Sequence, residues 1–206
     1  MNPFRLLVWL AALASFALPA KAHRLDECLQ ATRLDISANR VELEIDLTPG
    51  VRVADAFFAL LDSNRDGILS DAERDAYAKH FLAALVLSVD GCRRALKLVA
   101  VRYPDFAEMK AGTGVIHLQA SAEFAPLEPG AHQLYYQNQN QTNLSVYLVN
   151  AYLPKSPVIQ ITRQKRDLLQ TEICIDFTFS TNLSTVPRLI VQPEPAARAE
   201  GPVPIR

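Results

Sequence analysis

The segment Val41-Glu42-Leu43-Glu44-Ile45-Asp46-Leu47 alternates apolar and acidic residues without a break. Because successive side chains of a strand point to opposite faces, this pattern predicts a strand with one buried face and one face in water. The preceding segment 28–37 predicts a first strand, and a turn at 38–39 joins it to the second. Residues 48–50, Thr-Pro-Gly, end the second strand.

Further strand patterns fill most of the remaining chain: 85–89, 96–101, 114–124, 132–137, 146–152, 158–162 and 169–179. The turn Asp90-Gly91 predicts a hairpin between 85–89 and 96–101, and 163–167 reads as a charged hairpin tip. The inward residues of 114–124 would be Ile116, Leu118, Ala120, Ala122 and Phe124. Several short strands of this kind predict a mainly β chain, folded as an antiparallel β-sandwich that is Ig-like or similar.

The hydrophobic period changes between the second and third predicted strands. Apolar residues fall at helical spacing on both sides of a polar loop, and Ser70 with Glu73 forms a capping box for the second helix, expected at 71–85. The sequence thus predicts a helix-loop-helix insertion at 51–85. The residues at helical spacing before the loop are Val53, Phe57, Leu60 and Leu61, and the expected buried side chains of the second helix are Ala72, Tyr77, Phe81, Leu82 and Leu85.

The loop between these helices runs from Asp62 to Glu73 and reads Asp-Ser-Asn-Arg-Asp-Gly-Ile-Leu-Ser-Asp-Ala-Glu. Calcium loops of the EF-hand type carry oxygen ligands at positions 1, 3, 5, 7, 9 and 12, with glycine at position 6. Gly67 fills the glycine position. The predicted Ca²⁺ ligands are Asp62, Asn64, Asp66, the backbone carbonyl of Ile68, Ser70 and Glu73.

The same loop suggests what the ion does. Three carboxylates are few for a tight site, so the expected dissociation constant is about 10⁻⁴–10⁻³ M, as in extracellular modules. Sensor proteins open a Met-rich groove when calcium binds. Met1 and Met109 both lie outside the helix pair. We therefore expect a structural ion in preference to a regulatory one.

The ends of the chain indicate export. Residues 1–22 have the form of a signal peptide, with Arg5, an apolar run from Leu6 to Leu18 and a small-residue cleavage pattern ending at Ala22. We expect an exported protein, in the bacterial periplasm, with no membrane-spanning segment after the leader. The β domain would cover 23–185, and the Pro- and Ala-rich segment 186–206 would be a disordered tail.

Charge and cysteine content narrow the function further. The net charge is −1, and removal of the leader would take away two basic residues and make the chain more acidic. This balance argues against nucleic acid as a partner.

Cys28, Cys92 and Cys174 are the only cysteines. In an exported protein one disulfide can form and one thiol is left over, or all three are buried as small hydrophobic residues. Spacing does not select a pair.

Two other kinds of site can be built from residues of this chain, a transition-metal site and a hydrolase site. After cleavage His23 becomes the N-terminal residue, and a terminal amine with its own imidazole chelates Cu²⁺ or Ni²⁺. No second histidine stands at ligand spacing, so a solvated His23 is preferred. The acidic residues Glu42, Glu44 and Asp46 share one strand face, as a hydrolase site could, but regular alternation favours a solvated face. The sequence carries no catalytic motif, and we do not expect an enzyme.

The loop Asp62–Glu73 resembles the EF-hand family. More broadly, 23–27 (His-Arg-Leu-Asp-Glu), 46–50 (Asp-Leu-Thr-Pro-Gly) and 147–150 (Tyr-Leu-Val-Asn) resemble exported bacterial EF-hand domains. Such domains are similar to the N-terminal regions of nickel-permease-like hydrogenase/urease accessory membrane proteins. The resemblance implies an accessory or binding module with a protein partner in the periplasm or at the membrane. The first alternative is a transition-metal protein that uses His23 to assist a nickel, cobalt or copper transporter; the second is a hydrolase with an unrecognised site.

Overall fold

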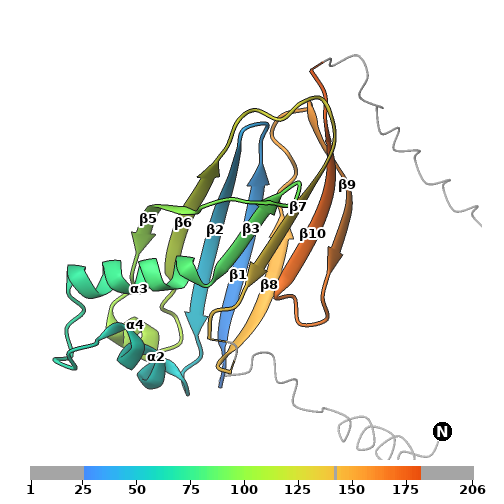
Figure 1. Ribbon diagram of the computed structural model, residues 1–206. Coiled ribbons are helices and arrows are strands. Elements are labelled where there is room, and N and C mark those ends of the chain that lie inside the picture. Colours follow the sequence, from blue (N-terminus) through green and yellow to red (C-terminus); the bar gives the residue numbers. More distant parts are fainter. Residues whose placement is uncertain (1–25, 142, 182–206) are drawn as a thin grey trace, which may run out of the picture.

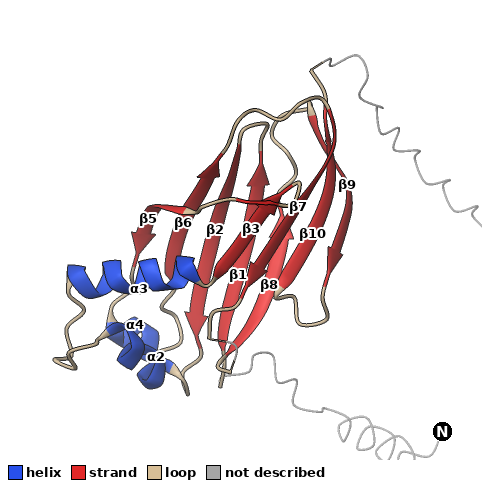
Figure 2. Ribbon diagram, viewed as in Figure 1, coloured by secondary structure: helices blue, strands red, loops and turns tan. Residues whose placement is uncertain are grey.

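The computed structural model describes residues 26–141 and 143–181 (Figure 1). The predicted signal peptide 1–22, His23 and the tail 186–206 lie outside these residues. The described part holds ten strands and three short helices, so the chain is mainly β (Figure 2). Within that part, no helix is long and apolar enough to cross a membrane.

The first sheet contains the alternating segment 41–47. Its strand order is β5 (Lys97–Arg102), β6 (Ile116–Glu123), β2 (Arg40–Pro49), β1 (Cys28–Ile36) and β8 (Ser145–Ala151). All neighbours are antiparallel except β1 and β8, which are parallel. On β2 the apolar residues Val41, Leu43, Ile45 and Leu47 are fully buried, as the alternation predicts.

The second sheet is antiparallel throughout. Its strand order is β4 (Cys92–Arg93), β3 (Leu85–Val89), β7 (Gly130–Asn138), β10 (Glu172–Phe179) and β9 (Ile159–Arg166). Buried side chains of both sheets belong to one hydrophobic core. A buried hydrogen bond of 3.0 Å between the hydroxyls of Thr32 on β1 and Tyr136 on β7 joins the sheets through this core.

Two strand predictions are wrong. The segment 96–101 does not pair with 85–89: β5 pairs with β6 in the first sheet, and the two-residue strand β4 takes its place beside β3. Residues 163–166 are no hairpin tip but the end of β9. The edge strand β9 exposes the four consecutive residues 162–165, so this part of its sequence lacks the expected apolar alternation. The turn follows at Asp167, whose Oδ1 accepts the Glu172 N–H at 2.9 Å.

The helix pair stands between β2 and β3, where the sequence predicts it. Its members are α2 (Ala54–Leu61) and α3 (Asp71–Ala83). Tyr77 and Phe81 are buried as predicted, but Ala72 is exposed, so its assignment to the buried side is wrong. Leu60 of α2 is 42% exposed. Helix α3 ends before Leu85, which is buried as the first residue of β3.

A third helix, α4 (Phe106–Lys110), was not predicted. It packs against α2 through the rings of Phe58 and Phe106, whose centroids are 3.9 Å apart, and through the fully buried Met109. The signal was a second capping box: Asp105 accepts the Glu108 N–H at 2.7 Å, and the Glu108 side chain accepts the Asp105 N–H at 3.1 Å. Helix α2 is therefore covered by a helix, while α3 contacts β5 and β3.

Candidate metal centre

The loop with the six predicted ligands joins the end of α2 to the start of α3. Asp62 caps α2, and its backbone N–H donates to the Phe58 carbonyl at 2.9 Å. Ser70 is the N-cap of α3. The two helices touch through the rings of Phe57 and Tyr77, with centroids 6.0 Å apart. Both ends of the loop are therefore anchored on packed helices.

Asp62, at loop position 1, has its side chain turned into the loop. The residue is only 4% exposed. Its Oδ2 accepts the Gly67 N–H at 2.9 Å, and its Oδ1 accepts the Asp66 N–H at 3.2 Å. The first predicted ligand thus fixes the middle of the loop by binding its backbone.

Asn64 and Asp66, at positions 3 and 5, are exposed and bond to each other. Asn64 Oδ1 accepts the Asp66 N–H at 2.9 Å, and Asn64 Nδ2 donates to Asp66 Oδ2 at 3.0 Å. Asp66 Oδ1 accepts the Ile68 N–H at 2.8 Å. These short-range bonds among side chains and nearby backbone N–H groups curl the loop.

Glu73, at position 12, is the most heavily hydrogen-bonded carboxylate of the loop. Its Oε2 accepts the Ser70 hydroxyl at 2.7 Å and the Ser70 N–H at 3.0 Å. Its Oε1 accepts the Ser63 hydroxyl at 3.1 Å and the Asn64 N–H at 3.2 Å. These donors, with Ser70 first among them, stabilise the charged form and lower the pKa of Glu73 to about 2. The group is therefore an anion at neutral pH.

Backbone conformation explains the glycine at position 6. Gly67 has φ +81°, in the left-handed region, although a Cβ there would meet no atom within 4 Å. Conformation and not space therefore requires glycine. Arg65 also has a positive φ, 61°, which a residue with a Cβ rarely adopts. The loop holds this less favourable backbone through the bonds to Asp62, Asn64 and Glu73.

Apolar contacts fix the loop from outside. Leu69, at position 8, is half-buried and packs against the core of this chain. Beside Glu73 lies a cavity of about 210 Å³ between α2 and α3, lined by Leu60, Leu61, Ser63, Glu73, Ala76, Tyr77 and His80. The Tyr77 hydroxyl is buried and has no hydrogen-bond partner within residues 26–141 and 143–181, and burial raises the pKa of Tyr77.

The donor set suits calcium in its chemistry. Its members are all oxygens, and each Asp62 oxygen accepts one N–H and keeps a free lone pair. Both Glu73 oxygens already accept two donors each, so a Ca²⁺ ion would displace some of these donors. Among the residues described, no three side chains of His, Cys, Asp or Glu form a group that could hold a metal ion. A calcium loop differs from such a group because amide, hydroxyl and backbone carbonyl oxygens supply part of the ligand set.

The acidic face of β2 forms an ion-pair network across the first sheet. Arg33 donates to Asp46 Oδ2 at 2.6 Å and to the Tyr152 hydroxyl at 2.9 Å, while Tyr152 donates to Glu44 at 2.6 Å. His117 Nδ1 lies 2.6 Å from Asp46 Oδ1. Burial alone would raise the pKa of Asp46, but the hydrogen bonds from Arg33 and His117 outweigh it and lower this pKa. Sequence reasoning identified the acidic residues but not the partners that neutralise them.

The three cysteines lie far apart in the fold, on β1, β4 and β10, and all are free thiols. Cys28 is fully buried, and burial raises its pKa to about 12. It behaves as a small hydrophobic residue of the core, but the other two cysteines do not, so the alternative of three buried thiols is wrong. Cys92 is exposed and Cys174 is half-buried.

No protein-family model matches this chain, and a search of curated proteins finds no match either. The motifs and the geometry of the loop therefore have to support any function by themselves.

Proposed function

We propose that this chain is an exported calcium-binding accessory module, in which one EF-hand inserted into a β-sandwich binds a single structural Ca²⁺. The observation that carries the proposal is a charge imbalance at the two ends of the loop. Asp62 and Glu73 are 4% and 7% exposed. Within the described residues, no Lys, Arg or His forms an ion pair with either carboxylate. Buried charges in proteins are paired or bind metals.

The residues that would hold the ion are those predicted from the sequence. Asp62, Asn64, Asp66 and Glu73 would supply side-chain oxygens, Ile68 its carbonyl, and Ser70 a hydroxyl or a water-mediated contact. Bound Ca²⁺ would serve as the cationic partner of these carboxylates. Because Asp62 ends α2 and Glu73 lies in the first turn of α3, the ion would hold the two helices together.

A structural role is supported by the surroundings of the helix pair. Phe57, Phe58, Tyr77 and Phe81 are already buried in the core, so the apolar faces of both helices are in use. Sensors instead keep an apolar groove that opens when calcium binds. The proposed module therefore uses its ion to stabilise the insertion, and its action on other molecules would be binding, with no catalytic step.

Thermal unfolding with and without Ca²⁺ tests the proposal. At a Ca²⁺ concentration of ten times the dissociation constant, mass action adds about 1.4 kcal/mol to the free energy of unfolding. For a chain of this size that raises the melting temperature by roughly 3–6 °C. Asp62→Asn keeps the size of the side chain and removes its charge, so the Ca²⁺-dependent rise is expected to disappear.

The matched control is Asp71→Asn, which neutralises a neighbouring carboxylate that is 98% exposed in its side chain and is not a predicted ligand. Its melting temperature should rise with Ca²⁺ as in the wild type. A wild-type melting curve that is unchanged by millimolar Ca²⁺, or an equal rise in wild type and Asp62→Asn, would contradict the proposal.

A further inference from the structure

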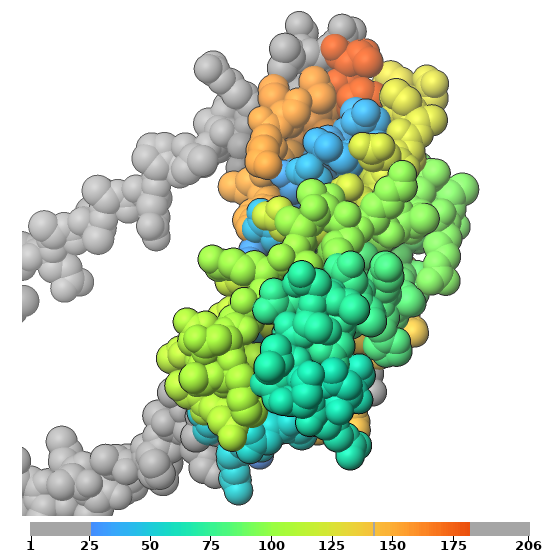
Figure 3. Space-filling view, turned by 90° about the vertical axis from the view of Figure 1, so that its left-hand side faces the viewer, coloured from blue at the N-terminus to red at the C-terminus, as the bar shows by residue number. Residues whose placement is uncertain are grey.

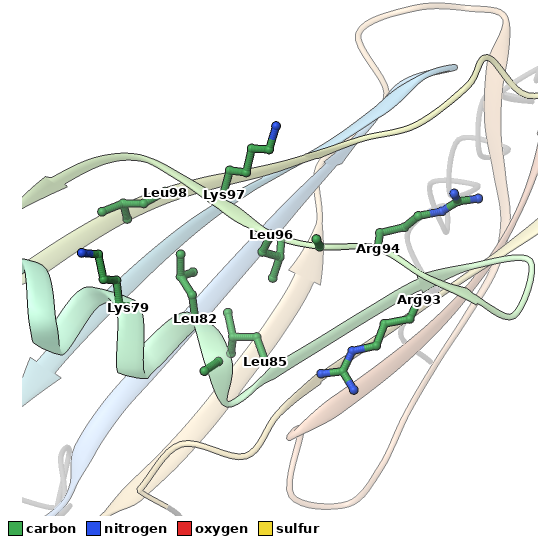
Figure 4. A pocket seen from close by; sticks show the side chains of 10 residues that line it. Lys79, Leu82, Leu85, Arg93, Arg94, Leu96, Lys97 and Leu98 are labelled. Atoms are coloured by element: carbon green, nitrogen blue, oxygen red, sulfur yellow. The ribbon is translucent and has the colours of Figure 1, made fainter.

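A second hollow lies on the other side of α3, away from the calcium loop. Its volume is about 540 Å³. It opens between the end of α3, the start of β3 and the segment 93–98 that crosses from the second sheet to the first (Figure 4). Figure 3 presents the face of the molecule that carries α3, in teal, beside the green segments that follow it in the chain.

The floor of this cavity is aliphatic. Leu82, Leu96 and Leu98 are half-buried and pack on the core, and Leu85 is 3% exposed. In Figure 4, Leu82, Leu85 and Leu96 point toward one another in the middle of the cavity. Such a floor offers an anchoring surface for an aliphatic side chain from another molecule.

The rim of the cavity is cationic. Lys79, Arg93, Arg94 and Lys97 line it, and within the described ranges none of them forms an ion pair. In Figure 4 the charged ends of Lys79, Arg94 and Lys97 point away from the leucines, while the Arg93 guanidinium lies on the Leu85 side of the cavity. Four basic residues around one opening, in a chain of net charge −1, make this a local positive patch.

Arg94 adds a specific unsatisfied group. Its guanidinium stacks over the ring of Phe124, 5.0 Å from the centroid, and interacts electrostatically with Asp90. Its Nε is nevertheless buried and has no hydrogen-bond partner among the residues that the structure describes. A buried donor on a charged group is costly to leave unpaired, so an incoming acceptor oxygen would be favoured here.

We propose that this cavity docks an acidic, aliphatic segment of a partner protein, whose Leu-type side chains rest on the leucine floor while its carboxylates face the basic rim. An extended segment suits the position. The edge strand β5 pairs only with β6, so the main-chain groups on its other edge can accept a further strand. Lys97 and Leu98, the first two residues of β5, belong to the lining of the cavity, so a segment bound there would lie beside this strand.

The chemistry of the lining favours this occupant over nucleic acid. Proteins that hold single strands combine basic residues with aromatic rings on which bases stack. The lining residues of this cavity include four leucines and two alanines but no aromatic residue. The proposal is independent of calcium, because no residue of the lining is a predicted Ca²⁺ ligand.

Fluorescence anisotropy with a synthetic peptide tests the docking. The probe is a fluorescein-labelled nonapeptide that alternates Glu and Leu, titrated with the full chain at low ionic strength. Binding is expected, and it should weaken as salt is added because the rim charges are exposed. The double variant Lys79→Glu, Arg93→Glu is expected to bind roughly tenfold or more weakly. The equally charged control, Arg52→Glu with Lys165→Glu, changes exposed basic residues elsewhere and should bind as the wild type does.

Three outcomes of the peptide titrations would overturn the proposal. The first is no binding of the Glu-Leu peptide to the wild type, and the second is equal weakening by both double variants. The third is equal binding of a matched Glu-Ser peptide, which would exclude the leucine floor as an anchor. Tighter binding of decanoate, with displacement of the peptide, would assign the cavity to a small amphipathic carboxylate instead. Circular dichroism of each variant confirms that a loss of binding is not a loss of fold.

Discussion

The hydroxyl of Ser70 donates to Glu73 Oε2 at 2.7 Å and accepts the Glu73 backbone N–H at 3.3 Å. One pair of residues thus begins α3 and also supplies the last two proposed calcium ligands. The start of the helix and the metal centre are therefore coupled, and changes at either residue should affect both.

The helix cap gives the first prediction. Ser70→Ala removes the side chain that caps α3, and N-cap substitutions of this kind cost about 1 kcal/mol in the free energy of unfolding. Urea denaturation in the presence of a chelator measures this cost without calcium. Ser63→Ala removes another hydroxyl bonded to Glu73 but leaves the cap, so its cost should be smaller. An equal or larger cost for Ser63→Ala would show that the cap is not what stabilises α3.

The second prediction concerns acid. The pKa of Glu73 is lowered to about 2 from its usual value of 4.5, so ionised Glu73 stabilises the folded state above pH 4.5. This contribution should be lost as the pH falls from 4.5 toward 2, where the folded state also becomes protonated. Glu73→Gln carries no titrating group, so its stability should fall less steeply over that interval. Identical pH profiles of unfolding for wild type and Glu73→Gln would contradict the assignment.

The hydrogen bond between the sheets gives the third prediction. Tyr136→Phe leaves the Thr32 hydroxyl, in a residue that is 2% exposed, without its partner and should cost about 1–3 kcal/mol. Thr32→Val should act in the same way from the other side. In the double variant neither polar group remains, so its cost should be less than the sum of the two single costs. Additive costs in chemical denaturation would show that the two hydroxyls do not interact.

The fourth prediction tests the helix that sequence reasoning missed. Met109 is fully buried beneath α4, so Met109→Ala should cost about 2–5 kcal/mol through the lost apolar contacts and the cavity left behind. The neighbouring Lys110→Ala changes a side chain that is 52% exposed but pairs with Asp55 and lies over the Phe106 ring, so its effect should be about 1 kcal/mol. Comparable costs for the two variants in urea denaturation would mean that α4 is not part of the packed structure.

Local pattern was enough for the central strands but not for the edges. In β2, burial on one face and water on the other leave a clear alternation, and the prediction of 41–47 is confirmed. Strand β9 lies at an edge and exposes residues 162–165 in succession, so the charged segment from Arg163 onward looks like a turn in the sequence. The pairing of β5 with β6 could not be read from Asp90-Gly91, because that turn sets only the local hairpin with β4.

For the candidate site, spacing identified residues whose environment only the structure supplies. The order of oxygen-bearing residues in 62–73 indicated a calcium loop, and the capping box of Ser70 and Glu73 is confirmed. The burial of Asp62 and Glu73 depends on how α2 and α3 pack, which no local pattern encodes. The basic rim around Leu82 and Leu96 could not be recognised from the sequence either. Its members come from α3, β4, β5 and the link between these two strands, and they meet only in the folded chain.

Equilibrium dialysis against Ca²⁺ tests the central claim most directly, because it counts bound ions without relying on stability. The account predicts one Ca²⁺ per chain, with a dissociation constant of about 10⁻⁴–10⁻³ M, and none bound by Asp62→Asn. The account would be contradicted if the wild type bound no Ca²⁺ at millimolar concentration, or if Asp62→Asn still bound one ion.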